Sequence, residues 1–146
     1  MKILVSVDLS EATPRILQAA GRLARSLSGK LWLLHVAEPE PDFVGYEAGP
    51  DVVRDQVARE FRDEHRKVQE YADGMREDGI AATALLIQGP IVDTVIAEAE
   101  RLGADLLVVG SHGYGAVYDL LVGSVSRGIL KHAEIPVLVV PVRGLD

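Results

Sequence analysis

Apolar runs and amphipathic segments alternate along the whole chain, and this alternation limits the possible folds more than any other feature. The apolar runs are rich in β-branched residues and predict strands at 2–8, 30–37, 81–88, 104–110 and 135–142. The segments between them have apolar residues at helical spacing and predict helices at 14–28, 51–78, 90–102 and 124–132. Strands joined by helices indicate a parallel sheet with right-handed crossovers on both faces. We therefore expect an α/β fold with an open, doubly wound, five-stranded parallel sheet.

Several residues predict where the helices begin and end. Thr13 and Pro14 suit the N-cap and the first position of the first helix. Gly29, Gly79 and Gly103 are each expected to end a helix, and Gly79 and Gly103 are expected at the C-terminal positions where glycine commonly adopts the left-handed conformation. We expect one face of the long helix 51–78 to be apolar, with His65 packed or hydrogen-bonded on that face; its apolar positions are Val53, Val57, Phe61, Val68, Ala72 and Met75.

A glycine-rich loop joins the fourth strand to the fourth helix. Its glycines are residues 110, 113, 115 and 123, and Ser124 and Ser126 open the helix that follows. Glycines let an anion approach the main chain, and the first N–H groups of a helix lack partners within the helix. This arrangement is typical of a phosphate site, although a long loop that uses glycine only for turns remains an alternative.

Composition and motifs exclude several other classes of function. The chain lacks the P-loop pattern GxxxxGK[ST] and the dinucleotide pattern GxGxxG. It has no cysteine for a disulfide or a thiolate metal site, and its net charge of −7 disfavours binding to nucleic acid. No apolar run approaches the ~20 residues that span a membrane. We expect a single cytoplasmic domain over residues 1–146, without a membrane partner.

Polar residues follow the strands where a ligand of such a sheet would bind. In an open α/β sheet, ligands lie beyond the carboxyl ends of the strands, where the strand order reverses. Asp8 follows the first strand, His35 is near the end of the second, and Gly110 ends the fourth. If the first and fourth strands are neighbours, Asp8 faces the glycine loop. A nucleotide would then place its ribose at Asp8 and its phosphates at the loop; alternatively, Asp8 caps the turn that follows it.

These segments together resemble the universal stress proteins, and within them the ATP-binding branch. The resemblance covers nearly the whole chain and includes Ile-Leu-Val-Ser-Val-Asp8-Leu-Ser10, Leu-His-Val36, the run from Gly103 to Gly113, and Gly123-Ser-Val-Ser126. The family's nucleotide motif has glycines separated by two and nine residues, then Ser or Thr, and this chain matches it at Gly110, Gly113, Gly123 and Ser124. The resemblance implies the strand order 3-2-1-4-5 and ATP, or the related ADP or AMP, as ligand.

The resemblance also implies a role for each matching position. It places Asp8 at the ribose or adenine edge and Val36 against the adenine ring. It places backbone groups around the phosphates at Gly110, His112, Gly113, Gly123, Ser124, Val125 and Ser126. Any magnesium ion would be held through the phosphates, without a metal site in the protein. Leu9 departs from the pattern, because the family often has glycine there, and the first turn is expected to be tighter against the base.

The leading functional hypothesis is an ATP-binding regulatory module that acts in the stress response with an unidentified protein partner. A slow ATPase or phosphotransferase is one alternative, but the loop offers a thin set of reactive groups and we assign no catalytic residue; these groups are His112, Tyr114, Tyr118 and Asp119. A nucleotide-free dimeric interaction protein is another. We expect a homodimer through the final strand, because the apolar run 137–142 has no Lys or Glu that would protect a free sheet edge.

Overall fold

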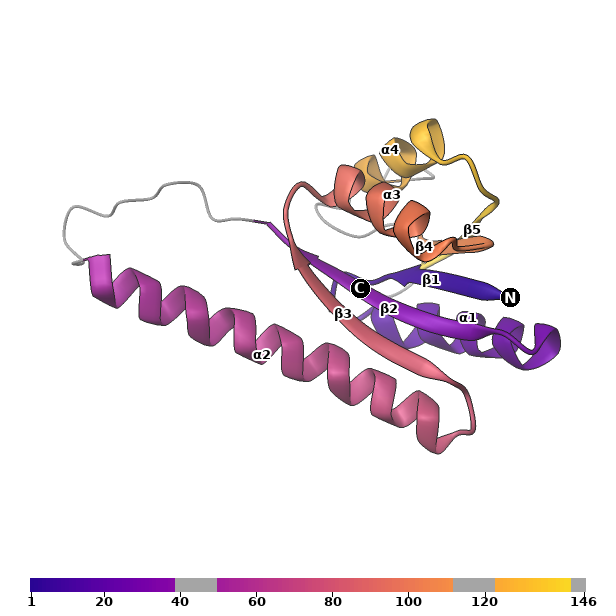
Figure 1. Cartoon of the computed structure of the whole chain (residues 1–146), viewed down its shortest axis with the longest axis horizontal. Coiled ribbons are helices and arrows are strands. Elements are labelled where there is room, and N and C mark those ends of the chain that lie inside the picture. Colours follow the sequence, from indigo (N-terminus) through magenta and orange to yellow (C-terminus); the bar gives the residue numbers. More distant parts are fainter. Residues whose placement is uncertain (39–49, 112–122, 143–146) are drawn as a thin grey trace.

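Five parallel strands form one open sheet in the computed structural model, which describes residues 1–38, 50–111 and 123–142 (Figure 1). The strands are β1 Lys2–Ser6, β2 Lys30–Ala37, β3 Ala82–Gln88, β4 Leu106–Gly110 and β5 Val137–Val140. Their order is β3-β2-β1-β4-β5. Both the predicted fold class and the strand order implied by the resemblance are confirmed.

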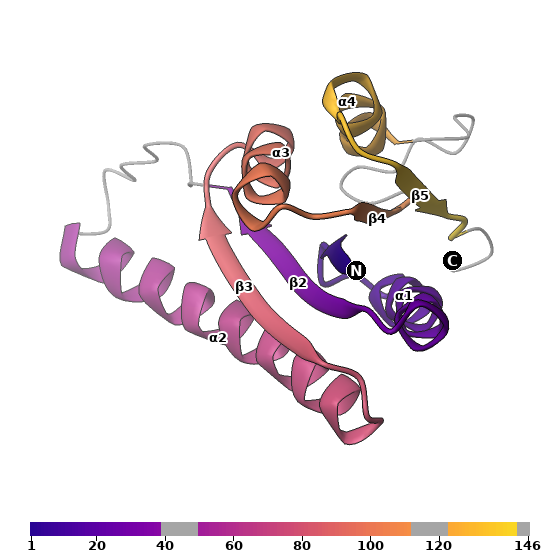
Figure 2. The same ribbon diagram turned by 45° about the vertical axis from the view of Figure 1, so that its right-hand side comes forward.

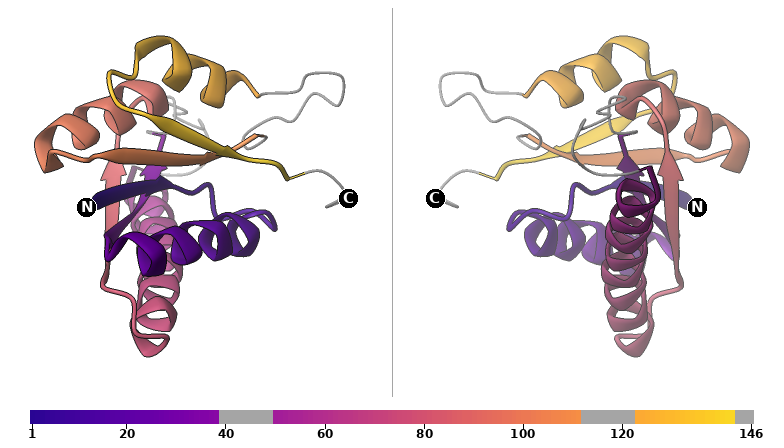
Figure 3. Two further views of the ribbon diagram at one scale, coloured as in Figure 1. Left: turned by 90° about the vertical axis from the view of Figure 1, so that its right-hand side faces the viewer. Right: turned by 90° about the vertical axis from the view of Figure 1, so that its left-hand side faces the viewer.

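Helices cover both faces of the sheet, as Figure 2 shows. The helices α1 Thr13–Leu27 and α2 Pro50–Glu77 lie on one face, and α3 Ile91–Leu102 and α4 Ser124–His132 lie on the other. Because side chains alternate along a strand, Ile3 and Val5 pack with α1 and α2, whereas Leu4 packs with α3 and α4. The hydrophobic core therefore consists of two layers separated by the sheet. Figure 3 shows β4 and β5 side by side beneath α4.

The predicted N-cap of the first helix is wrong. Ala12 is the N-cap, and Thr13 is the first helical residue. The reason is the turn at Ser10, which accepts hydrogen bonds from the backbone N–H groups at the start of the helix. The Ala12 N–H donates to Ser10 Oγ at 3.3 Å, and the Thr13 N–H donates to the Ser10 carbonyl at 3.1 Å. A side-chain cap from Thr13 is not needed there.

The C-terminal glycines of the helices have two different roles. Gly79 and Gly103 adopt the left-handed conformation expected of them, with φ of 81° and 63°. After α1, however, Ser28 adopts this conformation, with φ of 50°. A Cβ atom on Gly29 would lie 3.1 Å from Ile3 Cδ1, so glycine fits there because the chain passes close to β1. The helix ends at Leu27, just before Gly29, in agreement with the expectation that Gly29 stops it.

The last strand is shorter than predicted. It covers Val137–Val140 instead of 135–142, and Pro136 and Pro141 flank it. Proline has no N–H to donate to a neighbouring strand, so regular pairing is confined to the residues between the two prolines. Pro136 still contributes its carbonyl oxygen, which accepts a hydrogen bond from the Leu107 N–H at 3.0 Å.

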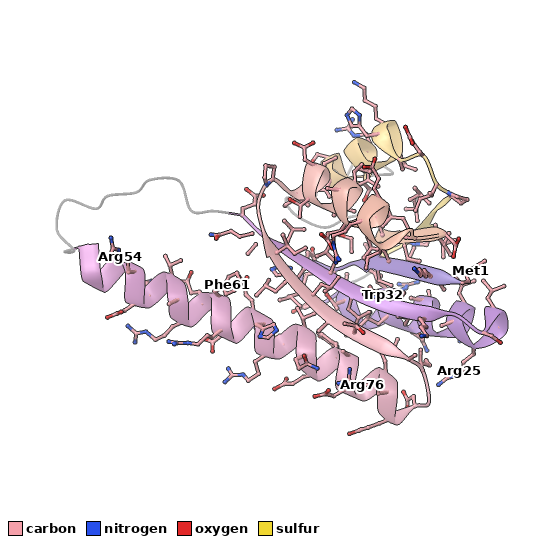
Figure 4. The ribbon with its side chains drawn as sticks, viewed as in Figure 1. Met1, Arg25, Trp32, Arg54, Phe61 and Arg76 are labelled. Atoms are coloured by element: carbon pink, nitrogen blue, oxygen red, sulfur yellow. The ribbon has the colours of Figure 1, made fainter. Side chains whose placement is uncertain are left out.

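The helix α2 extends beyond the sheet on which it packs (Figure 1). Its 28 residues span about 42 Å, whereas the eight residues of β2 span about 26 Å. Val68, Ala72 and Met75 are buried as predicted, but Phe61 is 38% exposed, and Figure 4 shows it on the outer half of the helix. His65 is also exposed, so the prediction that it packs on the apolar face is wrong. Within the described residues, no helix has the length and apolar character needed to cross a membrane.

Candidate functional site

The carboxyl ends of β1 and β4 lie side by side where the strand order reverses. These two strands pair with each other, while β2 and β3 extend to one side and β5 to the other. A small pocket opens here, and it brings together six of the nine predicted site residues: Asp8, Gly110, Gly123, Ser124, Val125 and Ser126. Residues of the adjoining strand ends and helices complete its lining: Ser6, Val7, Ile16, Val109 and Ile129. The predicted condition, that the first and fourth strands are neighbours, is met, and Asp8 lines the same pocket as Gly110 and Gly123, which flank the undescribed part of the glycine loop.

The pocket is too small to hold a whole nucleotide. Its volume is about 30 Å³, which is roughly the room that one or two water molecules occupy. A nucleotide would have to extend outward from it. The segment 112–122, which runs from β4 to α4, lies outside the described residues and includes the predicted contacts His112 and Gly113.

The first turn of α4 presents backbone N–H groups at this pocket. Gly123 is its N-cap in an extended conformation, and the first helical hydrogen bond runs from the Arg127 N–H to the Gly123 carbonyl at 2.9 Å. The N–H groups of Ser124, Val125 and Ser126 precede that bond and have no carbonyl partner within the helix. The positive end of the helix dipole lies at the same place, so the turn can bind an anion.

Ser111 holds the two ends of the loop together. Its carbonyl accepts the Gly123 N–H at 2.6 Å, and its own N–H donates to the Val140 carbonyl at 2.9 Å. Its hydroxyl oxygen, buried with the rest of the residue, accepts the Val142 N–H at 3.1 Å. The Gly123 N–H is therefore occupied and not available to a phosphate. Sequence reasoning gave Ser111 no role, because nothing in a single sequence distinguishes it from any other loop serine.

The two serines at the start of α4 differ in what their hydroxyl groups do. The Ser126 hydroxyl is buried and donates to the Gly110 carbonyl at 2.5 Å, so it joins the end of β4 to the helix. Ser124 is exposed and lines the pocket. The Ser126 hydroxyl is therefore occupied by Gly110, so a phosphate at this turn would meet the backbone N–H of Ser126 and not its hydroxyl.

Asp8 caps the turn that follows it, which was one of the two roles considered for it, and its contact with a nucleoside stays a prediction. It is half-buried, its Oδ1 accepts the Ser10 N–H at 3.0 Å, and it lines the pocket. The carboxylate therefore stabilises the turn that follows β1 and still faces the position of a ligand. Leu9, between these two residues, has a left-handed φ of 61°, a conformation that costs a non-glycine residue about 1–2 kcal/mol. A tighter approach of this turn to the base stays a prediction.

Val36 is not brought into the pocket with the other residues. Its side chain is 3% exposed and packs in the core with Ile91 and Val95 of α3. Contact between Val36 and an adenine ring stays a prediction.

The charge at the pocket is that of Asp8, and no lysine or arginine is among the described residues that line it. Arg127 and Lys131 of α4 are exposed. An anion would therefore be bound by N–H groups and the helix dipole, while Asp8 favours a hydroxyl-bearing group beside it. In the described parts of the chain, no group of three or more His, Asp or Glu side chains is placed to hold a metal ion.

Comparison with known proteins identifies the family. The sequence matches the Universal stress protein family over residues 1–141. The chain belongs to this family. Among its universal stress protein relatives, YxiE of Bacillus subtilis is 29% identical over 144 residues, covering 95% of this chain and 97% of YxiE. A Thermus aquaticus universal stress protein, named for its position in the QAH/OAS sulfhydrylase 3′ region, is 31% identical over 144 residues, covering 94% and 96% of the two chains.

Solved structures of similar fold include members bound to nucleotides. The hypothetical protein MJ0577 superimposes with a TM-score of 0.78 at 25% identity, covering 96% of this universal stress protein and 94% of MJ0577. A universal stress protein in complex with cAMP has a TM-score of 0.66 at 22% identity, covering 97% and 96% of the two chains. One from Archaeoglobus fulgidus in complex with dAMP has a TM-score of 0.65 at 21% identity, covering 95% and 96%. The last two likenesses show a shared fold.

Proposed function

We propose that this universal stress protein binds an adenine nucleotide, ATP or the related ADP or AMP, at the carboxyl ends of β1 and β4. The observation that carries the proposal is the pocket in which the Asp8 carboxylate faces the first turn of α4. A nucleotide has a group for each of these two partners. Its ribose hydroxyls can donate hydrogen bonds to the carboxylate, and its phosphates can accept hydrogen bonds from the N–H groups of the helix. Two proteins of the same fold, described as complexes with cAMP and dAMP, support an adenine nucleotide as the class of ligand.

The charges fix the orientation of the proposed nucleotide. A carboxylate repels phosphate, so Asp8 takes the ribose or the adenine edge, and the N–H groups of Ser124, Val125 and Ser126 take phosphate oxygens. Any magnesium ion is held through the phosphates. The backbone of Gly110, His112 and Gly113 completes the phosphate site in this proposal, with Gly123 as a structural member whose N–H binds Ser111.

We propose a regulatory role in the stress response, acting through the nucleotide state and an unidentified protein partner in the cytoplasm. Phosphoryl transfer needs a positioned water or base and groups that neutralise the γ-phosphate. Among the described residues lining the pocket, Asp8 is the one carboxylate, and its Oδ1 already accepts a hydrogen bond from Ser10. A slow ATPase or phosphotransferase is therefore the weaker candidate, and so is an interaction protein without nucleotide.

A homodimer through β5 is part of the proposal. This strand lies at one edge of the sheet and pairs with β4 on its inner side. Its exposed edge carries Val137, Leu138 and Val139, which are only partly buried. Antiparallel pairing with the β5 of a second copy would satisfy the free backbone groups and cover these apolar side chains.

The proposed function is tested first by the mass spectrum of small molecules released when freshly purified protein is denatured. An adenine nucleotide is the expected result. Calorimetry with Asp8→Ala then tests the site: ATP, ADP and adenosine should all bind about tenfold more weakly, since each contains the ribose and base that lose a hydrogen bond to a charged group. The matched control is Glu11→Ala, which removes an exposed carboxylate three residues away, outside the pocket.

Two results would contradict this assignment. If the folded wild-type protein binds no adenine nucleotide, the proposed function is wrong. If Asp8→Ala leaves adenosine binding unchanged while binding of ATP with magnesium collapses, Asp8 acts on the metal and not on the nucleoside.

A further inference from the structure

The imidazole of His35 is buried next to the Asp8 turn, although it does not line the pocket. His35 is 5% exposed and lies near the end of β2. It alternates with Leu31 and Leu33, whose side chains pack in the core beneath α1 and α2, so its ring points to the same face. A polar ring at such a position needs partners, because burying unpaired polar atoms is costly.

One ring nitrogen holds the backbone just before Asp8. The Nδ1 of His35 lies 2.9 Å from the carbonyl oxygen of Val7. A carbonyl oxygen can only accept, so Nδ1 carries the proton of this bond. Because β1 ends at Ser6, Val7 is the first residue beyond the strand. Its N–H donates to the Leu34 carbonyl at 2.9 Å, and thus both polar groups of its backbone are attached to β2.

The other ring nitrogen connects the same imidazole to α2. The Nε2 of His35 lies 3.3 Å from Oε2 of Glu64, whose side chain is 37% exposed. Because Nδ1 already carries a proton, this contact is a hydrogen-bonded ion pair in the form of the ring in which both nitrogens are protonated. Glu64 stands one turn before Val68, the first fully buried residue of the packed half of α2. The contact therefore lies where α2 leaves the sheet, between the packed half and the outer half that carries the exposed Phe61 (Figure 4).

We propose that His35 is a positioning residue, which fixes the Asp8 turn through the Val7 carbonyl and couples that turn to α2 through Glu64. The proposal rests on the proposed function, because it assumes that Asp8 binds the nucleoside. Its consequence is that a partner which moves the outer half of α2 changes nucleotide affinity, and that the nucleotide in turn changes the affinity of the partner.

The first test compares a substitution that keeps a hydrogen-bond donor at the Nδ1 position with one that removes it. In His35→Asn the side-chain amide can still donate to the Val7 carbonyl from near the Nδ1 position, whereas His35→Leu has no donor. Two readouts are measured: amide hydrogen exchange at Ser10, whose N–H binds Asp8, in protein without nucleotide, and the adenosine affinity. We expect about tenfold faster exchange and about tenfold weaker binding in His35→Leu, which loses both contacts. In His35→Asn, which loses only the Glu64 contact, we expect the smaller change of about two- to fivefold that is predicted below for Glu64→Ala.

The second test concerns the coupling to α2. Glu64→Ala removes the partner of Nε2, and Glu60→Ala is its matched control, one turn earlier on the exposed surface of the same helix. We expect Glu64→Ala to speed Ser10 exchange and to weaken adenosine binding by about two- to fivefold, a change typical of a half-exposed polar contact. Glu60→Ala should change neither.

The results that would overturn this proposal are different from the results that would refute the proposed function. Unchanged Ser10 exchange in folded His35→Leu overturns it, and so does faster exchange with unchanged adenosine affinity. Equal behaviour of Glu64→Ala and Glu60→Ala overturns the coupling to α2. If His35→Leu does not fold, His35→Gln replaces it, because its longer amide reaches the Nε2 position and should not hold Val7. A wild-type protein that binds no adenosine refutes the proposed function, while Ser10 exchange still decides whether His35 holds the turn.

Discussion

The hydrogen bond from Ser126 to Gly110 predicts a measurable loss of stability in Ser126→Ala. The bond is 2.5 Å long, and Ser126 is 4% exposed. A typical hydrogen bond contributes about 0.5–1.5 kcal/mol to the free energy of unfolding. Removing the Ser126 hydroxyl leaves the Gly110 carbonyl partly unpaired, so we expect a loss at the upper end of that range. We therefore expect the free energy of unfolding to fall by about 1–1.5 kcal/mol. For a chain of this size, that lowers Tm by about 2–6 °C.

The matched variant is Ser124→Ala, whose hydroxyl is exposed two residues away. Urea unfolding should give unchanged stability for Ser124→Ala and a lower midpoint with an unchanged m-value for Ser126→Ala. Calorimetry with ATP should show the opposite order, with the larger loss in affinity for Ser124→Ala, because Ser124 is exposed and lines the pocket, whereas the Ser126 hydroxyl is bound to Gly110. Wild-type stability in Ser126→Ala together with a large loss of ATP binding would refute this reasoning, because the hydroxyl would then bind the ligand and not Gly110.

Three further predictions concern stability and assembly. Thr13→Val should raise Tm by about 2–4 °C, because the buried Thr13 hydroxyl has no hydrogen-bond partner among the described residues and valine has the same shape without a polar atom; a lower Tm would show that the hydroxyl is paired. Leu9→Ile keeps the side-chain volume but places a β-branched residue at a φ of 61°, so chemical denaturation should show a loss of about 1 kcal/mol, and equal stability would contradict the left-handed turn. Val139→Lys places a charge on the proposed β5 interface and should shift light scattering toward the monomer; a wild-type monomer at tens of micromolar, or a soluble dimer unaffected by the lysine, would rule out that interface.

Most of the fold could be predicted from the sequence, because the hydrophobic pattern that specifies each element is local. The bounds of β2 and α4 agree with the predicted ranges for this reason. The differences from prediction have more than one cause. β5 is shorter than predicted because Pro136 and Pro141, next to its two ends, have no N–H to donate to a neighbouring strand. The left-handed residue after α1 is Ser28, and glycine at position 29 is required by the close approach to Ile3, a contact distant in sequence. His65 is exposed because α2 is longer than the sheet on which it packs. The spacing of apolar residues in a helix does not indicate where that sheet ends.

The candidate site was predictable in its location but not in its hydrogen bonds. Topology alone places Asp8 beside the start of α4, because these residues follow neighbouring parallel strands. Which groups are already occupied depends on atomic positions: the Gly123 N–H binds Ser111, and the Ser126 hydroxyl binds Gly110. The contact between His35 and Glu64 joins residues of two different elements, and no motif in one sequence indicates it.

The most direct test of the nucleotide site is to map amide chemical shifts by NMR while ATP and adenosine are added separately. We predict that ATP shifts the amides of Ser124, Val125 and Ser126, whereas adenosine leaves these three nearly unchanged and shifts those around Asp8. Saturating ATP that leaves the first turn of α4 unchanged, or that perturbs only residues away from the carboxyl ends of β1 and β4, would contradict the proposed site.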